Sequence, residues 1–304
     1  MAFAQGSRSR LTYIVENTFG TTPGSPSMVT LPFNTHSMTL NKTALESPEI
    51  RSDRQRDIFR HGARQIEGDI EVDFRADDFD DLLESAMFSA FDTDNYLRIG
   101  TTLKHLSIED GALDIDQYRL FTGCTVNTFA MNVSANAIVT ATFGIIGKDM
   151  TVSGTSVDAS PTASSGNQPY DGNNFIGNVK EGGVSIATIT SIEFSLENGI
   201  TPAMVIGSTT TPELGYGRAM LSGTISAYFN NATLMNKFIN ETESEIEFTL
   251  DDNVSGNAYR FWFPRVKYNG ADVPVSGEDH RMISIPFVGL LDSVEQSELV
   301  IQKL

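Results

Sequence analysis

Apolar and polar residues alternate along several stretches of the chain, the pattern of strands with one buried face. The clearest stretch covers residues 66–74, whose apolar or small positions are Ile66, Gly68, Ile70, Val72 and Phe74. A period of two predicts a half-buried β-strand. Further strands are predicted at residues 103–108, 118–131, 136–147 and 183–196, with Gly, Asn, Ser and Pro between them.

A short amphipathic helix is predicted directly after the first of these strands, at residues 79–90. Its apolar positions follow the spacing of one helical face and are Phe79, Leu82, Leu83, Ala86 and Met87. Asp77 and Asp78 precede them as candidate N-caps.

The most informative feature is an internal repeat. Residues 61–79 match residues 216–234 at an offset of 155, which pairs Gly68 with Gly223 and Phe74 with Phe229. Three more blocks match in the same order, namely 35–41 with 190–196, 104–110 with 246–252, and 141–147 with 285–291. A second helix is predicted at residues 232–241. Four collinear blocks indicate a duplication.

The expected fold is therefore mostly β, in the α+β sense, with two tandem β-barrel or β-sandwich domains that each carry one short packed helix. The first domain spans residues 1–150 and includes an N-terminal arm. Residues 151–173 form a linker by composition, since they are rich in Ser, Gly, Thr and Pro. The second domain spans residues 174–304.

Composition and charge narrow the function. The chain has 304 residues with 21 Lys and Arg against 39 Asp and Glu, a formal net charge of −18. This balance argues against a protein that grips nucleic acid by its phosphates. One cysteine and four scattered histidines give no metal-ligand spacing, and no nucleotide-binding or nucleophile motif is present. We expect no enzymatic activity, no cofactor, no metal, no signal peptide and no membrane span.

Two charged elements are candidate functional sites. The polar positions of the strand at 66–74 form a row of acids, Glu67, Asp69, Glu71 and Asp73. This row fits a negative wall that a polyanion passes without binding, or an interface that faces arginines. An ordinary solvated strand face is the alternative. The matching positions of the second copy are uncharged: Ser222, Thr224, Ser226 and Tyr228.

The second element is a charged hairpin loop at residues 46–62. Its charged residues include Arg51, Asp53, Arg54, Arg56, Asp57 and Arg60. Guanidinium groups on an otherwise acidic chain favour contacts with carboxylates of another subunit or ring. A mobile solvated loop is the alternative. The N-terminal arm, with the apolar and aromatic residues Phe3, Leu11, Tyr13 and Phe19, is a further candidate contact, or a strand or cap of its own domain.

Three segments resemble the tail tube (major tail) proteins of long-tailed bacteriophages. They are SRLTYIVENTFGTTPGSP near the N-terminus, the loop ESPEIRSDRQRD, and YDGNNFIGNVKEGG with TSIEFSLENGI in the second half. The resemblance implies a β-barrel or sandwich subunit whose rings stack into a hollow tube in the virion. It also implies contacts with tape measure, tail tip and terminator proteins, production in the host bacterial cytoplasm, and DNA that passes through the lumen without specific binding.

Rings of this family usually contain six barrel domains. Because the chain carries two copies, the resemblance favours a trimer that forms a pseudo-hexameric ring. The alternative function is a two-domain β-sandwich adhesin or carbohydrate-binding module, which requires exposed aromatic residues in a cleft.

Overall fold

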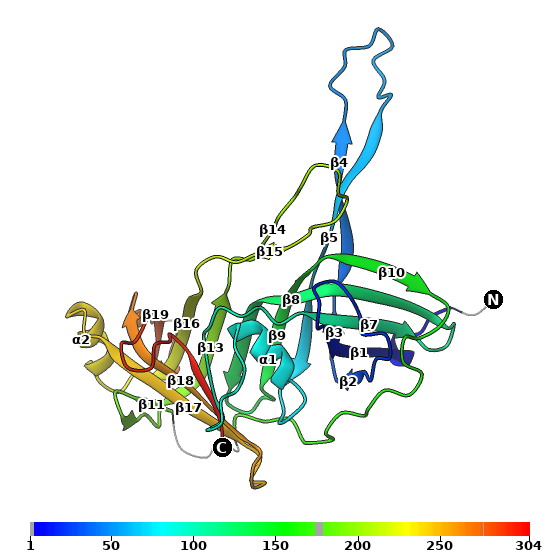
Figure 1. The fold of residues 1–304 in the computed structure, drawn as a ribbon. Helices are drawn as coiled ribbons and strands as arrows, with labels where there is room; N and C mark the ends of the chain where they lie inside the picture. The colour runs from blue at the N-terminus through cyan, green and yellow to red at the C-terminus, as the bar shows by residue number, and fades with distance from the viewer. Residues whose placement is uncertain (1–2, 174–178, 276) are drawn as a thin grey trace.

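The computed structural model describes residues 3–173, 179–275 and 277–304. Strands dominate, and the chain divides into two halves that lie side by side (Figure 1). The elements of the first half are η1 (Gly6–Arg8), β1 (Ser9–Val15), β2 (Val29–Leu31), β3 (Thr35–His36), β4 (Thr39–Glu46), β5 (Phe59–Asp73), α1 (Asp80–Met87), β6 (Tyr96–Arg98), β7 (Leu106–Ala112), β8 (Gln117–Ser134), β9 (Thr140–Gly147) and β10 (Asp149–Ser153).

The second half contains a corresponding set. Its elements are β11 (Lys180–Glu181), β12 (Val184–Ser185), β13 (Ile189–Glu197), β14 (Thr201–Pro202), β15 (Leu214–Gly215), β16 (Met220–Tyr228), α2 (Thr233–Ile239), β17 (Ser244–Asp251), β18 (Ala258–Tyr268), β19 (Met282–Gly289) and β20 (Val300–Lys303). The mostly-β fold class expected from the sequence is confirmed.

The two halves have the same antiparallel strand order. In the first half the hydrogen-bonded order is β4-β5-β9-β8-β7-β1-β2. In the second half it is β13-β16-β19-β18-β17-β11-β12. One helix follows the second strand of each set, α1 after β5 and α2 after β16. The repeat in the sequence therefore corresponds to a repeat in topology.

Strand register corrects three of the four sequence alignments. β7 and β17 show the same register shift, directly before Ile108 and before Ile246, so these strands match at an offset of 138 in place of 142. Gly68 lies against the backbone of Met38, and Gly223 pairs with Phe194, so the upstream strands match at an offset of 156. Ile145 pairs with Gly68 and Phe287 with Gly223, which gives the closing strands an offset of 142 in place of 144. The closing strands are thus shifted by two residues, which keeps the same positions on the buried face. The apolar pattern alone does not detect such a shift.

The long strand β8 connects the layers of the molecule and its two halves. Its N-terminal part pairs with β7 and β10, whereas its C-terminal part pairs with β9 and β13. The β8–β13 ladder runs from Ser191 opposite Ser134 to Glu197 opposite Thr128. A second junction joins β6 to β20. One buried apolar cluster runs through both halves, so the two share a continuous core.

The two helices are packed to different extents. Leu82, Leu83, Ala86 and Met87 of α1 are buried, whereas α2 has no buried residue. Residues 88–105, which include β6, contact α1, but only residues 240–243 connect α2 to β17. The N-cap expectation for α1 was wrong, since the N-cap is Phe79 and the Asp78 carboxylate accepts a hydrogen bond from the Ser165 amide instead.

The stretch with linker composition is ordered along residues 151–173. The Thr162 amide donates to Met28 and the Thr30 amide donates to Thr162, which bridges the stretch to the start of β2. Farther along, Tyr170 is only 1% exposed. The segment is a strap across the first half, because repeated backbone hydrogen bonds and one buried aromatic residue fix its path.

We predict that Gly68→Ala lowers the free energy of unfolding by about 2 kcal/mol, because φ is +152° and a Cβ would lie 2.5 Å from the Met38 backbone. Chemical denaturation measures this change. Gly24→Ala is the control, since a Cβ there meets no atom within 4 Å. Equal stability of the two variants would contradict the prediction.

Candidate functional site

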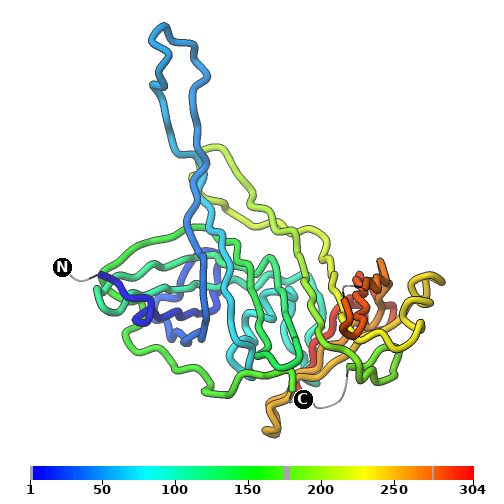
Figure 2. Tube along the Cα trace, turned by 180° about the vertical axis from the view of Figure 1, so that it is seen from behind, coloured from blue at the N-terminus to red at the C-terminus, as the bar shows by residue number. Residues whose placement is uncertain are grey.

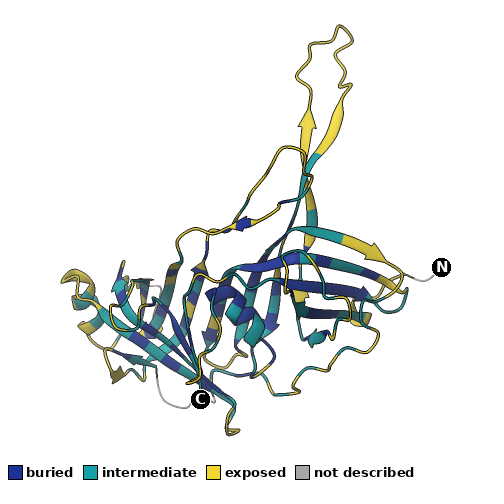
Figure 3. Cartoon of the chain, viewed as in Figure 1, coloured by how far each residue is buried: buried dark blue, intermediate teal, exposed yellow. Residues whose placement is uncertain are grey.

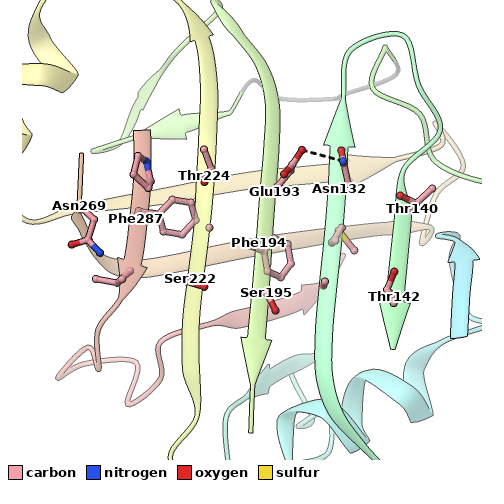
Figure 4. Close-up of a pocket in the computed structure, with 15 residues that line it drawn as sticks. Asn132, Thr140, Thr142, Glu193, Phe194, Ser195, Ser222, Thr224, Asn269 and Phe287 are labelled. Carbon is pink, nitrogen blue, oxygen red and sulfur yellow. Dashed lines mark hydrogen bonds between the residues drawn. The ribbon is translucent and has the colours of Figure 1, made fainter. Parts of the chain in front are cut away.

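A broad polar face covers one side of the sheet that joins the halves. Five neighbouring strands, β9, β8, β13, β16 and β19, form an open groove on this side (Figure 4). Their groove-facing side chains are mostly small or polar: Thr140, Thr142, Asn132, Glu193, Ser195, Ser222, Thr224, Pro286 and Val288. Phe194 and Phe287 belong to the same strands but are 3% and 1% exposed. The groove therefore has no exposed aromatic residue among its described lining.

The acid row lies on this same face. Directly opposed residues of antiparallel strands project to one side, and Glu71 opposes Thr142 while Asp73 opposes Thr140. Thr140 in turn opposes Asn132, and Asn132 opposes Glu193. The register thus places the four acids of β5 at one end of the polar face and the groove beyond them.

Three acids of the row accept hydrogen bonds from neutral donors. Asn34 donates to Asp73 at 2.7 Å, Thr35 to Glu71 at 3.1 Å, and Asn41 to Glu67 at 3.2 Å. Within the described residues none of the four acids forms an ion pair. Neutral donors orient the carboxylates without cancelling their charge, so the row keeps its negative potential.

Sequence reasoning missed two further acids on this face. Glu193 and Glu197 alternate along β13, and Glu193 accepts a hydrogen bond from Asn132 at 3.2 Å. The signal was present, since Ile192, Phe194 and Leu196 are the buried partners in a period of two. The counterparts of the β5 acids, from Ser222 to Tyr228 on β16, lie on the same face and are uncharged.

The charged loop is the tip of a hairpin that projects from the body. Strand pairing reaches Glu46 opposite Phe59, so the unpaired tip spans residues 47–58, a shorter segment than the 46–62 expected. Figure 3 shows the hairpin exposed along its outer length. Its tip also presents apolar side chains to solvent, with Ile50 98% exposed.

Ion pairs order this tip internally. Arg51 donates to both carboxylate oxygens of Asp53 and to Asp57, and Arg56 pairs with Glu46 at 3.0 Å. The hydrogen bonds from Arg51 hold the pKa of the Asp53 carboxyl below its usual range. Arg54 and Arg60 form no ion pair within the described residues, which leaves two guanidinium groups for other partners.

A second hairpin, not identified from the sequence, projects to the same side. It spans the segment between β13 and β16 and contains the β14–β15 pair, and Figure 2 shows it meeting the first hairpin partway along its projecting length. The Arg64 amide of β5 donates to Thr209 at 2.8 Å, which fixes this contact. Its tip is also apolar, with Ile206 fully exposed. The two halves thus direct equivalent hairpins to one end of the molecule.

The described residues also bear on metal sites and on membrane-spanning helices. No group of three or more His, Cys, Asp and Glu side chains in the described part of the chain is arranged to hold a metal ion. No helix in that part is long and apolar enough to span a membrane.

The described chain thus has two halves of like topology, a polar face that both share, and hairpins that project to one end. The family model described as phage tail tube protein matches residues 6–289. The chain therefore belongs to the phage tail tube protein family. The protein is a structural component of the virion. It assembles with other phage proteins into a multi-subunit tube. No individual curated protein matches the chain.

We predict that Arg51→Gln leaves the thermal midpoint of unfolding unchanged, since exposed ion pairs contribute little to global stability. Loss of its hydrogen bonds to Asp53 and Asp57 should nevertheless loosen the tip. Cleavage after Glu49 by a glutamate-specific protease should become several-fold faster. Arg54→Gln is the matched control, and equal acceleration in both variants would contradict the role given to Arg51.

Proposed function

We propose that each half of the chain is one tube domain and that three chains close a ring of six domains around a hollow lumen. The observation that carries this proposal is the β8–β13 ladder, which joins two domains of like topology edge to edge. The same junction, repeated between chains, closes a ring with one interface type. Closed rings are the usual result of a head-to-tail interface whose rotation closes.

Both edges needed for that repetition are available. β3 and the first residues of β4 are the counterpart of β13, and within the described residues both strands pair only with β5. Residues 269–273 continue β18 beside β19, through a hydrogen bond from the Asn269 amide to Pro286 and a bridge between Asp272 and Ser284. They take the place that the C-terminal part of β8 has in the first half. Pairing of β4 with this stretch of the next chain satisfies backbone groups that are otherwise open to solvent.

The polar face is the proposed lumen wall. Ring closure by strand pairing extends one sheet around the ring, and its core-facing side is already filled by apolar side chains. The opposite side, with Glu67, Asp69, Glu71, Asp73 and the two acids of β13, then faces the passing DNA. Fixed negative charge repels phosphates and prevents the contact ion pairs that would hold DNA in place.

The two hairpins are the proposed contacts between stacked rings. They project from the same end of each domain and carry exposed apolar tips, together with the unpaired Arg54 and Arg60. Apolar area supplies association energy, and guanidinium groups select carboxylates of the adjoining ring.

Other elements of the proposal follow from membership in the family. Tape measure, tail tip and terminator proteins are the proposed partners at the lumen and at the two tube ends, and the subunit is made in the host bacterial cytoplasm. We propose a structural role without catalysis. An adhesin or carbohydrate binder requires exposed aromatic residues in a groove, a feature that the described lining of this groove lacks.

The hairpin contact predicts a specific assembly defect. Replacing residues 47–58 by the dipeptide Asn-Gly should preserve the fold, because this dipeptide closes a two-residue hairpin and surface loops tolerate length changes. Single rings should form while tubes do not, as seen by negative-stain electron microscopy. Tubes of normal length from this variant would show that the tip is not the stacking contact.

The lumen wall predicts a defect in DNA passage. Replacing Glu67, Asp69, Glu71 and Asp73 by lysine should give tubes that retain DNA, with retention relieved by added salt, since basic walls bind by counterion release. Each wall charge acts weakly across about one Debye length of roughly 8 Å. The effect therefore depends on summation over many rings, and slowed ejection of DNA from particles measures it.

Two controls separate a lumen from an interface. Glu67→Gln, Asp69→Asn, Glu71→Gln and Asp73→Asn together should leave assembly intact and retain little DNA. If the lysine variant cannot assemble at all, the row is an interface between subunits. If its tubes release DNA at the normal rate, the row faces outside solvent.

A further inference from the structure

One aromatic residue of the strap fastens the two halves together. Tyr170 lies between Phe74 of the first half and Tyr259 of the second, with ring centroids 5.9 and 6.5 Å away. Its hydroxyl donates to the Asn257 carbonyl at 2.8 Å, in the turn between β17 and β18. Tyr170 therefore packs against the core of the first half and also contacts the second half.

The backbone of Tyr170 is equally well defined. Phe74 donates to the Val139 carbonyl, Val139 donates to Tyr170, and Tyr170 donates to Phe74, all at 2.8–2.9 Å. Tyr170 is thus inserted at the end of the β5–β9 ladder, where it satisfies one donor and one acceptor.

The corresponding place in the second half is open. Phe229 is the counterpart of Phe74 and donates to the Arg281 carbonyl at 2.9 Å. Within the described residues, the Arg281 amide donates to no acceptor and the Phe229 carbonyl receives no donor. Phe229 is only half-buried, whereas Phe74 is fully buried. The Arg281 guanidinium lies 5.7 Å from the Phe229 ring centroid.

Strand register places the position that matches Tyr170 at the start of the N-terminal arm, within one residue of Phe3. Glu181 opposes Ile246 and hydrogen-bonds to Lys237 of α2. Tyr13 opposes Ile108 and hydrogen-bonds to Asp81 of α1. Glu181 and Tyr13 are therefore equivalent positions. Tyr170 precedes Glu181 by 11 residues, and Phe3 precedes Tyr13 by 10.

Phe3 is positioned for an equivalent contact. Phe3 is 76% exposed, and two residues farther along the chain the Gln5 amide donates to Asp114 at 2.7 Å, in the turn between β7 and β8. This turn is the counterpart of the one on which Tyr170 docks. Figures 1 and 2 place the start of the chain and α2 at opposite ends of the molecule, so Phe3 and Phe229 of one chain cannot meet.

We propose that Phe3 of one chain packs on Phe229 of the neighbouring chain in the ring, in the place that Tyr170 occupies between the halves. Its backbone closes the open ladder end at Phe229 and Arg281. The occupant is thus a second copy of this chain, bound head to tail. The inference rests on the proposed ring and adds to it a contact outside the sheet.

Truncation tests the contact energetically. Burial of the Phe3 side chain contributes free energy to association. Its loss in Phe3→Ala should therefore raise the protein concentration needed for ring formation about tenfold. Phe3→Tyr should assemble like the wild type, since tyrosine is the residue in the equivalent place. Leu291→Ala removes a comparably exposed side chain elsewhere and is the matched control. Analytical ultracentrifugation measures all four proteins.

A disulfide tests the geometry. The double variant Phe3→Cys with Phe229→Cys should form cross-links between chains on oxidation of assembled rings, in a series that ends at the covalent trimer. Each single variant should remain uncross-linked, because the native Cys124 is fully buried.

The outcomes separate this contact from the function it rests on. The contact is overturned if the wild-type protein forms rings, Phe3→Ala assembles equally well and the double cysteine variant gives no cross-link. That outcome does not contradict the tube function. Absence of any ring from the wild-type protein overturns both.

Discussion

The pairing of β8 with β13 is the interaction on which the rest of the molecule depends. It converts two domains into one sheet with a shared core side and a shared polar side. Strand pairing is directional, so this junction also fixes how the hairpins of both halves point and which edges stay open. In the proposed ring, the chain is thus one section of a larger closed sheet, with one junction already made within the chain.

The two halves share one strand order but differ in the packing of their helices and in the charge of their second strands. α1 packs on β8 and β6 and has five buried residues, whereas α2 has no buried residue. β5 carries four acids where β16 carries neutral residues, so the charge of the proposed lumen varies around the ring. In the proposed lumen, DNA at the centre of the tube would experience the summed potential of all wall charges. Because the potential of each charge falls off gradually over several ångströms, charged and neutral segments can alternate around the wall.

Much of this architecture could be predicted from the sequence. The alternation at residues 66–74 and the helical spacing after it predicted β5 and α1, and the repeat predicted their counterparts, because period and burial are directly coupled. Register was the weak point. A two-residue shift left the apolar face of β19 unchanged, and only the glycine opposite Phe287 reveals the true alignment.

Features set by tertiary contacts were beyond such reasoning. Residues 151–173 have the composition of a linker, and their order along the first half comes from buried Tyr170 and from backbone hydrogen bonds to Met28 and Phe74. Asp78 has the chemistry of an N-cap but binds the strap instead. The acid row was found from its alternation, while its relation to Glu193 requires the β8–β13 pairing. The hairpin of the second half was missed because its strands contain only two residues each.

The central claim is that six like junctions close the ring, three within chains and three between them. Cryo-electron microscopy of tubes assembled from the purified protein tests it most directly. The account predicts three chains per ring, with β4 of each chain hydrogen-bonded to residues 269–273 of the next and the acid row lining the lumen. Rings of six chains, or rings in which β4 remains an open edge, would contradict it.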